Sequence, residues 1–145
     1  MDSFIERVDV WSASIPDKTG GLSWLLKGMD EAGADFNFVI ARRTPENPGS
    51  GVVFVTPIRG DREVEAASTL GFSLTSSVDA VCFEADNKPG ATARLTGLIA
   101  DAGINIRGLS VAVIGTRFVT YIGFDSTNDA ETAVSIFQDA GAEVI

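Results

Sequence analysis

The sequence predicts an α+β protein made of two ferredoxin-like βαββαβ units, each an antiparallel sheet with its helices on one face. The first observation behind this prediction is an internal repeat at an offset of 70 residues. The second is that both repeats alternate strand-like and helix-like segments in the same order. The third is the size of the chain, since 145 residues that are 45% apolar can bury a core. We expect domains at residues 1–76 and 77–145, joined side by side into one eight-stranded sheet.

The repeat is read most clearly at two loops, 17–20 and 87–90, which have the sequences Asp-Lys-Thr-Gly and Asn-Lys-Pro-Gly. Carried forward without a gap, the same offset matches apolar residues with apolar residues and glycines with glycines. Because the register survives along most of the chain, coincidence is a poor explanation. The matched pairs include Leu25/Leu95, Met29/Ile99, Gly33/Gly103, Phe54/Phe124 and Gly71/Gly141.

In the first repeat, strands are expected over residues 8–15, 36–41, 51–56 and 72–75, where β-branched and aromatic residues gather. A helix is expected between the first two strands, because apolar residues recur there at helical spacing and Gly33 ends the pattern. The stripe consists of Leu22, Leu25, Leu26 and Met29. A second helix is expected over residues 61–70, ended by Gly71, and residues 42–50 read as a hairpin loop.

The second repeat has the same order of elements. Strands are expected over residues 80–85, 104–114 and 118–124, with a tight turn at Gly115-Thr116 and a short final strand at the end of the chain. One helix is expected over residues 91–102. The other helix is expected to begin at Asn128, which stands three residues before Glu131 as in a capping box, and to end at Gly141.

Composition excludes several classes of function. The chain has no histidine, which removes His-based zinc sites and Ser-His-Asp triads, and its one cysteine, Cys82, is expected to be a buried, inert thiol. A net charge of −9 argues against a nucleic-acid partner. The sequence shows no targeting segment and no apolar run long enough to span a membrane, so we expect a cytoplasmic protein that needs no cofactor and no metal.

Two motifs in the second repeat resemble the ACT domain family. They are the loop Asn87-Lys88-Pro89-Gly90 before the first helix and the segment Gly103-Ile104-Asn105-Ile106 that leads into the second strand. The first repeat matches both motifs in part, so the chain resembles a stand-alone tandem ACT protein with no attached catalytic domain. The resemblance implies a regulatory protein, not an enzyme, that binds a small metabolite, usually an amino acid, at interfaces between paired domains.

Physical chemistry agrees with a ligand at these loops. Gly20 and Gly90 allow the backbone to approach a ligand, and the helix N-termini that follow favour a carboxylate. Side-chain amides can contact both ends of a zwitterion. The resemblance implies that Asn87 of one domain works with Asp35 of its neighbour, and Asp17 with Asn105. The candidate ligand-binding residues are Asn87, Gly90, Asn105, Ile104, Asp17, Gly20 and Asp35.

The first repeat departs from the family pattern, because Asp17 and Asp35 stand where the second repeat has Asn, and Thr19 stands where it has proline. A carboxylate accepts hydrogen bonds from an ammonium but repels a carboxylate, so the two sites need not share a ligand.

Alternatives remain open for the site and for the function. Gly20 and Gly90 could be turn glycines, and Asn105 and Asp35 could satisfy backbone groups at strand ends. The chain could instead be a ligand-free interaction module that regulates a metabolic enzyme. A small enzyme is the third hypothesis, in which Asp17 would have to act. Under the first two hypotheses we expect a homodimer, since the helix-free sheet faces need cover.

Overall fold

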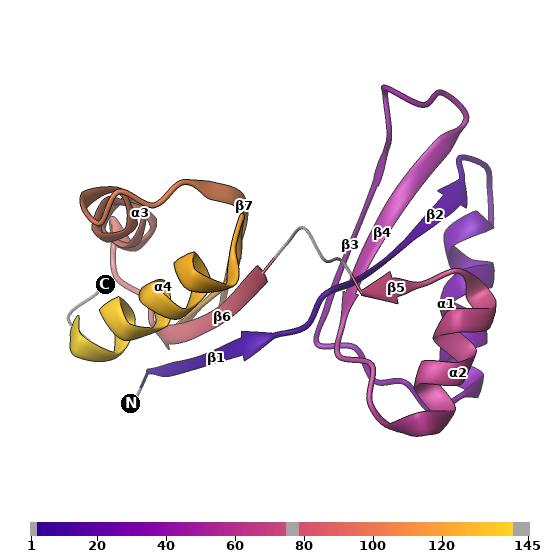
Figure 1. The fold of residues 1–145 in the computed structure, drawn as a ribbon, viewed down its shortest axis with the longest axis horizontal. Coiled ribbons are helices and arrows are strands. Elements are labelled where there is room, and N and C mark those ends of the chain that lie inside the picture. The colour runs from indigo at the N-terminus through magenta and orange to yellow at the C-terminus, as the bar shows by residue number, and fades with distance from the viewer. Residues whose placement is uncertain (1–2, 75–78, 141–145) are drawn as a thin grey trace. The chain divides into compact units, whose positions relative to one another are not determined.

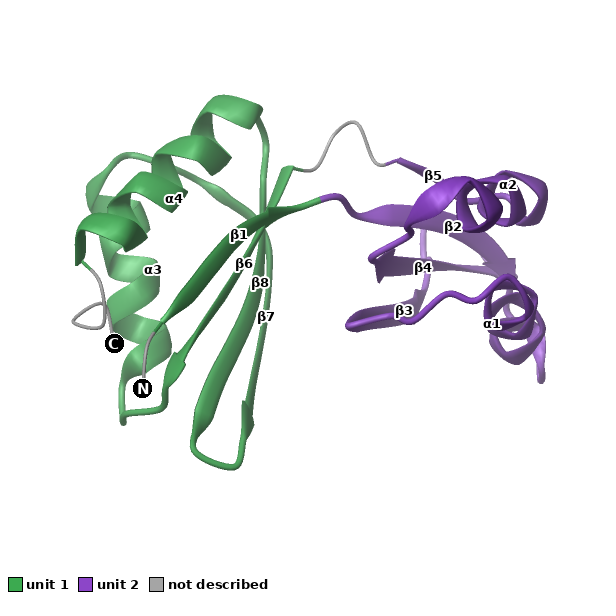
Figure 2. Cartoon of the chain, turned by 90° about the horizontal axis from the view of Figure 1, so that it is seen from below, with its two compact units in different colours: residues 1–8, 76–145 green, residues 9–75 purple. Residues whose placement is uncertain are grey.

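The computed structural model describes residues 3–74 and 79–140. The chain divides into two compact units, which Figure 2 distinguishes by colour: unit 1 comprises residues 1–8 and 76–145, and unit 2 comprises residues 9–75. The described strands of each unit form a four-stranded antiparallel sheet. The helices of each unit pack on one face of its sheet (Figure 2). The predicted ferredoxin-like α+β fold is therefore confirmed, while the joining of the two sheets side by side stays a prediction.

Unit 2 follows the predicted order of elements closely (Figure 1). Its sheet has the strand order β3-β4-β2-β5, in which β2 and β4 are the inner strands. The second strand begins two residues later than the sequence predicted, and the predicted strand residue 75 lies outside the described residues. The elements are β2 (Trp11–Pro16), α1 (Gly21–Glu31), β3 (Phe38–Arg43), β4 (Ser50–Thr56), α2 (Gly60–Leu70) and β5 (Ser73–Leu74).

Unit 1 has the strand order β1-β6-β8-β7. Its elements from the second half of the chain are β6 (Asp79–Asp86), α3 (Ala91–Asp101), β7 (Ile106–Ile114), β8 (Arg117–Phe124) and α4 (Thr127–Ala140). The predicted final strand falls outside the described residues. The edge position beside β6 is filled by β1 (Phe4–Val8), which comes from the start of the chain.

The position of β1 corrects the predicted domain limits of 1–76 and 77–145. β1 pairs antiparallel with β6 from Phe4 opposite Glu84 to Val8 opposite Ala80, as β5 pairs with β2 in unit 2 (Figure 1). Residues 1–8 therefore belong to the unit of the second repeat. Val8 is the last residue of β1 and not the first of the strand predicted over residues 8–15. The sequence did not predict β1, because the pattern of a short strand does not identify the sheet that the strand joins.

The repeat also changes register at the hairpins. Arg43 lies opposite Gly51 across the β3–β4 hairpin, whereas its counterpart Val113 lies opposite Phe118 across the tighter β7–β8 turn. Structurally equivalent residues of the two repeats are therefore 70 positions apart before the hairpin. After the hairpin they are three positions closer in the sequence, because the second hairpin is shorter. The predicted match of Phe54 with Phe124 is wrong, because Phe124 is fully buried in its core and Phe54 is only partly buried. The longer loop between β3 and β4 explains the shift.

Each unit has its own core between sheet and helices. In unit 1, Phe83 of β6 stacks on Phe137 of α4 with ring centroids 5.2 Å apart, and Phe118 of β8 packs edge-on against Phe83. In unit 2, Leu25 and Met29 of α1 are buried, as the predicted apolar stripe requires. Burial of such side chains stabilises each unit by roughly 1.5–3 kcal/mol per residue.

The helix ends agree with the sequence except at α4. Gly71 ends α2 with φ +93°, as predicted. The cap of α4, however, is Ser126, whose Oγ accepts a hydrogen bond from the Asp129 N–H at 3.1 Å. Asn128 lies inside the helix, so the predicted Asn128–Glu131 capping box is wrong. Serine and asparagine are both good caps, and the position of the preceding strand decided between them.

Candidate functional site

The loop between β6 and α3, residues 87–90, is fixed at both ends by backbone hydrogen bonds. The Asn87 N–H donates to Thr116 O in the β7–β8 turn at 2.8 Å. At the other end the Ala91 N–H donates to Lys88 O at 3.1 Å. The loop is thereby held against the hairpin of its own sheet, and Asn87 is exposed at its start.

Gly90 is the residue that turns this loop into α3. Gly90 has a left-handed φ of +82° and occupies the N-cap position of α3, where it has no side chain that could accept a capping hydrogen bond. A Cβ at this position would lie 2.8 Å from Arg94 Nη1, which itself donates to Pro89 O at 2.9 Å. Arg94 thus folds back over the loop, a contact that the sequence did not predict. The left-handed φ agrees with the alternative of a turn glycine, and the predicted approach of a ligand to Gly90 stays a prediction.

An open cavity of about 430 Å³ lies beside the loop. Its polar side is formed by the loop and the first turn of α3, and its apolar side by Val111 and Val113 of β7 and Phe118 of β8. The polar side consists of Asn87, Lys88, Pro89, Gly90, Ala91, Thr92 and Ala93. The cavity thus combines an amide, an ammonium and the N-terminus of a helix with aliphatic carbon, which fits a small molecule with an anionic head and a short apolar part.

Val111 and Val113 give the cavity its apolar wall because β7 is an edge strand. They lie opposite Thr120 and Phe118 of β8, so they face the same side of the sheet as the core. Unlike Phe118, they remain 38% and 51% exposed. The cavity therefore has an apolar wall that a ligand or another molecule could cover.

An ion pair borders the loop on the strand side. Arg117 Nη1 of β8 donates to Asp86 Oδ1 at 3.1 Å, and Asp86 directly precedes Asn87. This hydrogen bond lowers the pKa of the Asp86 carboxyl, so the group remains ionised at neutral pH. The pair joins the end of β6 to the start of β8 beside the loop.

The corresponding loop of unit 2, residues 17–20, has the same backbone arrangement. The Asp17 N–H donates to Gly49 O at 3.0 Å, and Gly20 precedes α1 with a left-handed φ of +85°. The difference lies in the side chains, because Arg43 Nε of β3 donates to Asp17 Oδ2 at 2.9 Å. This ion pair was not predicted from the sequence.

Asn105 and Asp35 lie far from the loops of their own units. β6 and β7 are parallel, since both pair antiparallel with β8, so Asn87 and Asn105 lie at opposite ends of the sheet, roughly 25 Å apart. The same argument separates Asp17 from Asp35 in unit 2. The predicted pairs across domains, Asn87 with Asp35 and Asp17 with Asn105, stay predictions.

Ile104 has a structural role in the turn that ends α3. Its N–H donates to Ile99 O at 3.2 Å, and its side chain is partly buried against the core of unit 1. The structure therefore gives Ile104 a packing function at the end of the sheet opposite the cavity.

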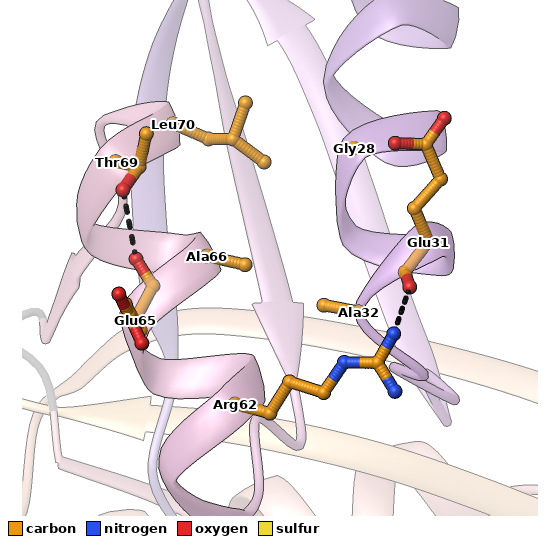
Figure 3. A pocket seen from close by; sticks show the side chains of 8 residues that line it. All are labelled: Gly28, Glu31, Ala32, Arg62, Glu65, Ala66, Thr69 and Leu70. Carbon is orange, nitrogen blue, oxygen red and sulfur yellow. Dashed lines mark hydrogen bonds between the residues drawn. The ribbon is translucent and has the colours of Figure 1, made fainter.

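A second cavity, of about 450 Å³, lies between α1 and α2 of unit 2 (Figure 3). Its lining includes the small residues Gly28, Ala32 and Ala66. Arg62 reaches across from α2 to donate to Glu31 O at 2.9 Å (Figure 3). A Cβ at Gly28 would lie 2.7 Å from Leu70 Cδ1, so the glycine allows the two helices to approach. No prediction concerned this cavity. The sequence signal that could have indicated this close approach of two helices is Gly28, a glycine inside a predicted helix.

The described residues were compared with the requirements of a metal site and of a reactive thiol. Among residues 3–74 and 79–140, no three His, Cys, Asp or Glu residues gather in a way that could hold a metal ion. Cys82 is buried, as predicted, and burial raises the pKa of its thiol to about 11. The helices in these ranges are all too short or too polar to cross a membrane.

Residues 81–144, which lie within unit 1, match the family model described as "ACT domain". The match to the ACT domain family covers this segment, which is less than half of the chain. The resemblance predicted from the Asn87 and Asn105 motifs is thereby confirmed. ACT domains are regulatory, which agrees with the predicted class of function. No curated protein matches the chain.

Several solved structures resemble the chain over both the ACT domain and unit 2. Protein BT0572 from Bacteroides thetaiotaomicron has a TM-score of 0.75 at 15% identity, covering 98% of this chain and 96% of its own. The ligand-free regulatory subunit of aspartate kinase from Thermus thermophilus has a TM-score of 0.66 at 18% identity, covering 97% of both chains. Aspartate kinase from Clostridium acetobutylicum has a TM-score of 0.61 at 14% identity, covering 94% of this chain and 33% of its own. At these identities the likeness shows the fold alone.

Proposed function

We propose that this chain is a non-enzymatic regulatory protein that binds an amino acid at interfaces between ACT domains. The observation that carries the proposal is the cavity beside Asn87 and Gly90 in the ACT domain. Its lining has a group for each part of such a ligand. The helix N-terminus and Lys88 attract a carboxylate, the Asn87 amide oxygen accepts from an ammonium, and Val111 and Val113 contact an aliphatic side chain.

A two-domain site completes this proposal. Asp35 of a neighbouring domain would add the negative charge that an ammonium prefers, as the family resemblance implies for its pairing with Asn87. The open side of the cavity, along the exposed valines of β7, offers the place at which a neighbouring domain would close the site. We propose a homodimer in the cytoplasm as the arrangement that supplies such neighbours, and sedimentation should then give twice the mass of one chain.

Thermal unfolding in the presence of single amino acids tests the proposal. A ligand at 100 times its dissociation constant stabilises the folded state by about 2.7 kcal/mol, which for this chain length raises the midpoint by roughly 5–10 °C. We expect one or a few amino acids to give this shift. The variant Asn87→Ala should lose it, and Asn128→Ala, an exposed asparagine on α4, should keep it. An unshifted midpoint with every amino acid would refute amino-acid binding.

A metabolic enzyme as partner is the second candidate function, in which the chain acts as a regulatory module. The similarity to the regulatory subunit of aspartate kinase favours it. Co-purification from native cells separates the two candidates. Recovery of an enzyme whose activity changes on adding the chain, with no amino acid required, would support the ligand-free module. Recovery of self-associated chain alone would count against it.

A further inference from the structure

The two repeats present the same loop with different neighbours on the adjacent strand. Before the hairpin the structural offset is 70 residues, so Asp17 corresponds to Asn87, Gly20 to Gly90, and Arg43 to Val113. The strand registers support the last match. Arg43 faces the same side as core residues Val53 and Val55 of β4, and Val113 faces the same side as core residue Phe118 of β8.

In unit 1 these positions leave the cavity open, whereas in unit 2 they bind each other. Val113 lines the cavity beside Asn87 and has no polar group to offer the loop. Arg43 instead extends from β3 to the loop, and its Nε donates to Asp17 Oδ2 at 2.9 Å. The guanidinium thus lies where, in unit 1, a ligand would meet the side chain of Asn87.

From this comparison we infer that the Asp17–Arg43 ion pair takes the place of a ligand in unit 2. The chain then binds a single amino acid, at the Asn87 loop of unit 1. This inference rests on the proposed function and adds the number and location of the sites. It also assigns Arg43 a role as the residue that keeps the unit 2 loop closed to ligand.

Charge explains why an amino acid does not simply displace the pair. The pair itself is weak, because the Arg43 side chain is 82% exposed. Displacement would nevertheless bring a ligand carboxylate close to the Asp17 carboxylate, in a chain whose net charge is −9. The neutral amide of Asn87 carries no such repulsion. Unit 1 therefore favours the ligand by electrostatics as well as by available space.

Calorimetric titration of the full chain tests the inference with L-valine, L-isoleucine and L-threonine as probes, chosen for their fit to the valine wall of the cavity. We expect one equivalent per chain for the wild type. Asn87→Ala should weaken binding at least tenfold. The double variant Asp17→Asn with Arg43→Val copies the residues of unit 1 and should bind a second equivalent. Arg42→Val, which removes a neighbouring cation of β3 outside the pair, should still bind one.

The outcomes separate the inference from the proposed function. Two equivalents in the wild type would overturn the inference and leave amino-acid binding intact. One equivalent that survives Asn87→Ala but is lost in the double variant would place the ligand in unit 2 and overturn it as well. If the double variant still binds only one equivalent, the Asp17–Arg43 ion pair is not what keeps ligand out of unit 2, and the inference is overturned. No binding of any of the three probes would overturn the inference, whereas the proposed function fails only if the unfolding midpoint is also unshifted with every amino acid.

Discussion

Arg7 donates from Nη2 to Asp79 Oδ1 at 2.8 Å, although the two residues are 72 positions apart in the chain. Thr127 Oγ1 at the start of α4 donates to the same carboxylate oxygen at 3.1 Å. Arg7 lies on β1 and Asp79 on β6, so this contact ties the start of the chain into unit 1. Unit 1 is therefore assembled from two segments of the chain, and unit 2 lies between them in the sequence.

Deletion of residues 1–8 should loosen unit 1 and leave unit 2 unchanged. The deletion removes the strand that pairs with β6 and the Ile5 side chain that packs on the core of unit 1. We expect hydrogen exchange of the β6 amides to accelerate at least tenfold, while the β3 and β4 amides keep their protection. An equal loss of amide protection in both units, or unchanged exchange rates of the β6 amides, would contradict the assignment of β1 to unit 1.

A milder variant serves as a check on that deletion. Arg7→Ala should lower the free energy of unfolding of unit 1 by about 1 kcal/mol, because its pair with Asp79 is only partly exposed. The matched control Arg107→Ala removes a pair with Asp125 that is exposed on both sides, so its effect should be smaller.

Ser126→Ala should destabilise α4, whereas Asn128→Ala should be nearly neutral. The serine hydroxyl accepts from the Asp129 N–H, and its loss leaves that donor without a partner, at about 1 kcal/mol. Asn128 is exposed within the first turns of the helix. Urea unfolding of both variants measures the difference. A larger loss in Asn128→Ala would favour the capping box predicted from the sequence.

Gly97→Ala should stabilise the protein, and Gly28→Ala should not. Both glycines lie inside helices, where alanine is favoured by roughly 0.8–1 kcal/mol. A Cβ at Gly97 meets nothing within 4 Å, but at Gly28 it would come within 2.7 Å of Leu70 Cδ1. The midpoint of urea unfolding should therefore rise for Gly97→Ala alone. Equal gains in both variants would mean that Leu70 moves away freely.

Cys82 should react slowly in the folded protein and make stability depend on pH at alkaline values. Burial raises the pKa of its thiol from 9.0 to about 11, so folding favours the protonated form. The resulting stability is fully present below pH 9 and is lost as the pH rises from about 9 to 11. Measurements of unfolding free energy should show a steeper alkaline decline in the wild type than in Cys82→Ser.

Thiol labelling provides the second readout for Cys82. At pH 8, alkylation should be at least a hundredfold slower in the folded chain than in the unfolded chain, because the side chain is buried and protonated. Labelling at comparable rates in both states would show that this part of the sheet opens readily.

The sequence by itself determined the fold class, the repeat and most helices and strands. Helical spacing of Leu25 and Met29, and glycines such as Gly71 that adopt positive φ, are local signals that tertiary contacts only reinforced. The loop 87–90 was also predictable, because its glycine and the helix after it define a backbone geometry from nearby residues.

Tertiary structure alone decided which sheet β1 joins, which residue caps α4 and what lies beside each candidate loop. The partner of a strand depends on hydrogen bonds to distant residues, and no local pattern in residues 4–8 identifies β6. Likewise, Arg43 and Val113 occupy equivalent positions in the two repeats. The sequence around them did not predict that Arg43 binds Asp17 or that Val113 lines a cavity. Side chains that meet across a sheet are brought together by register, which only the folded chain defines.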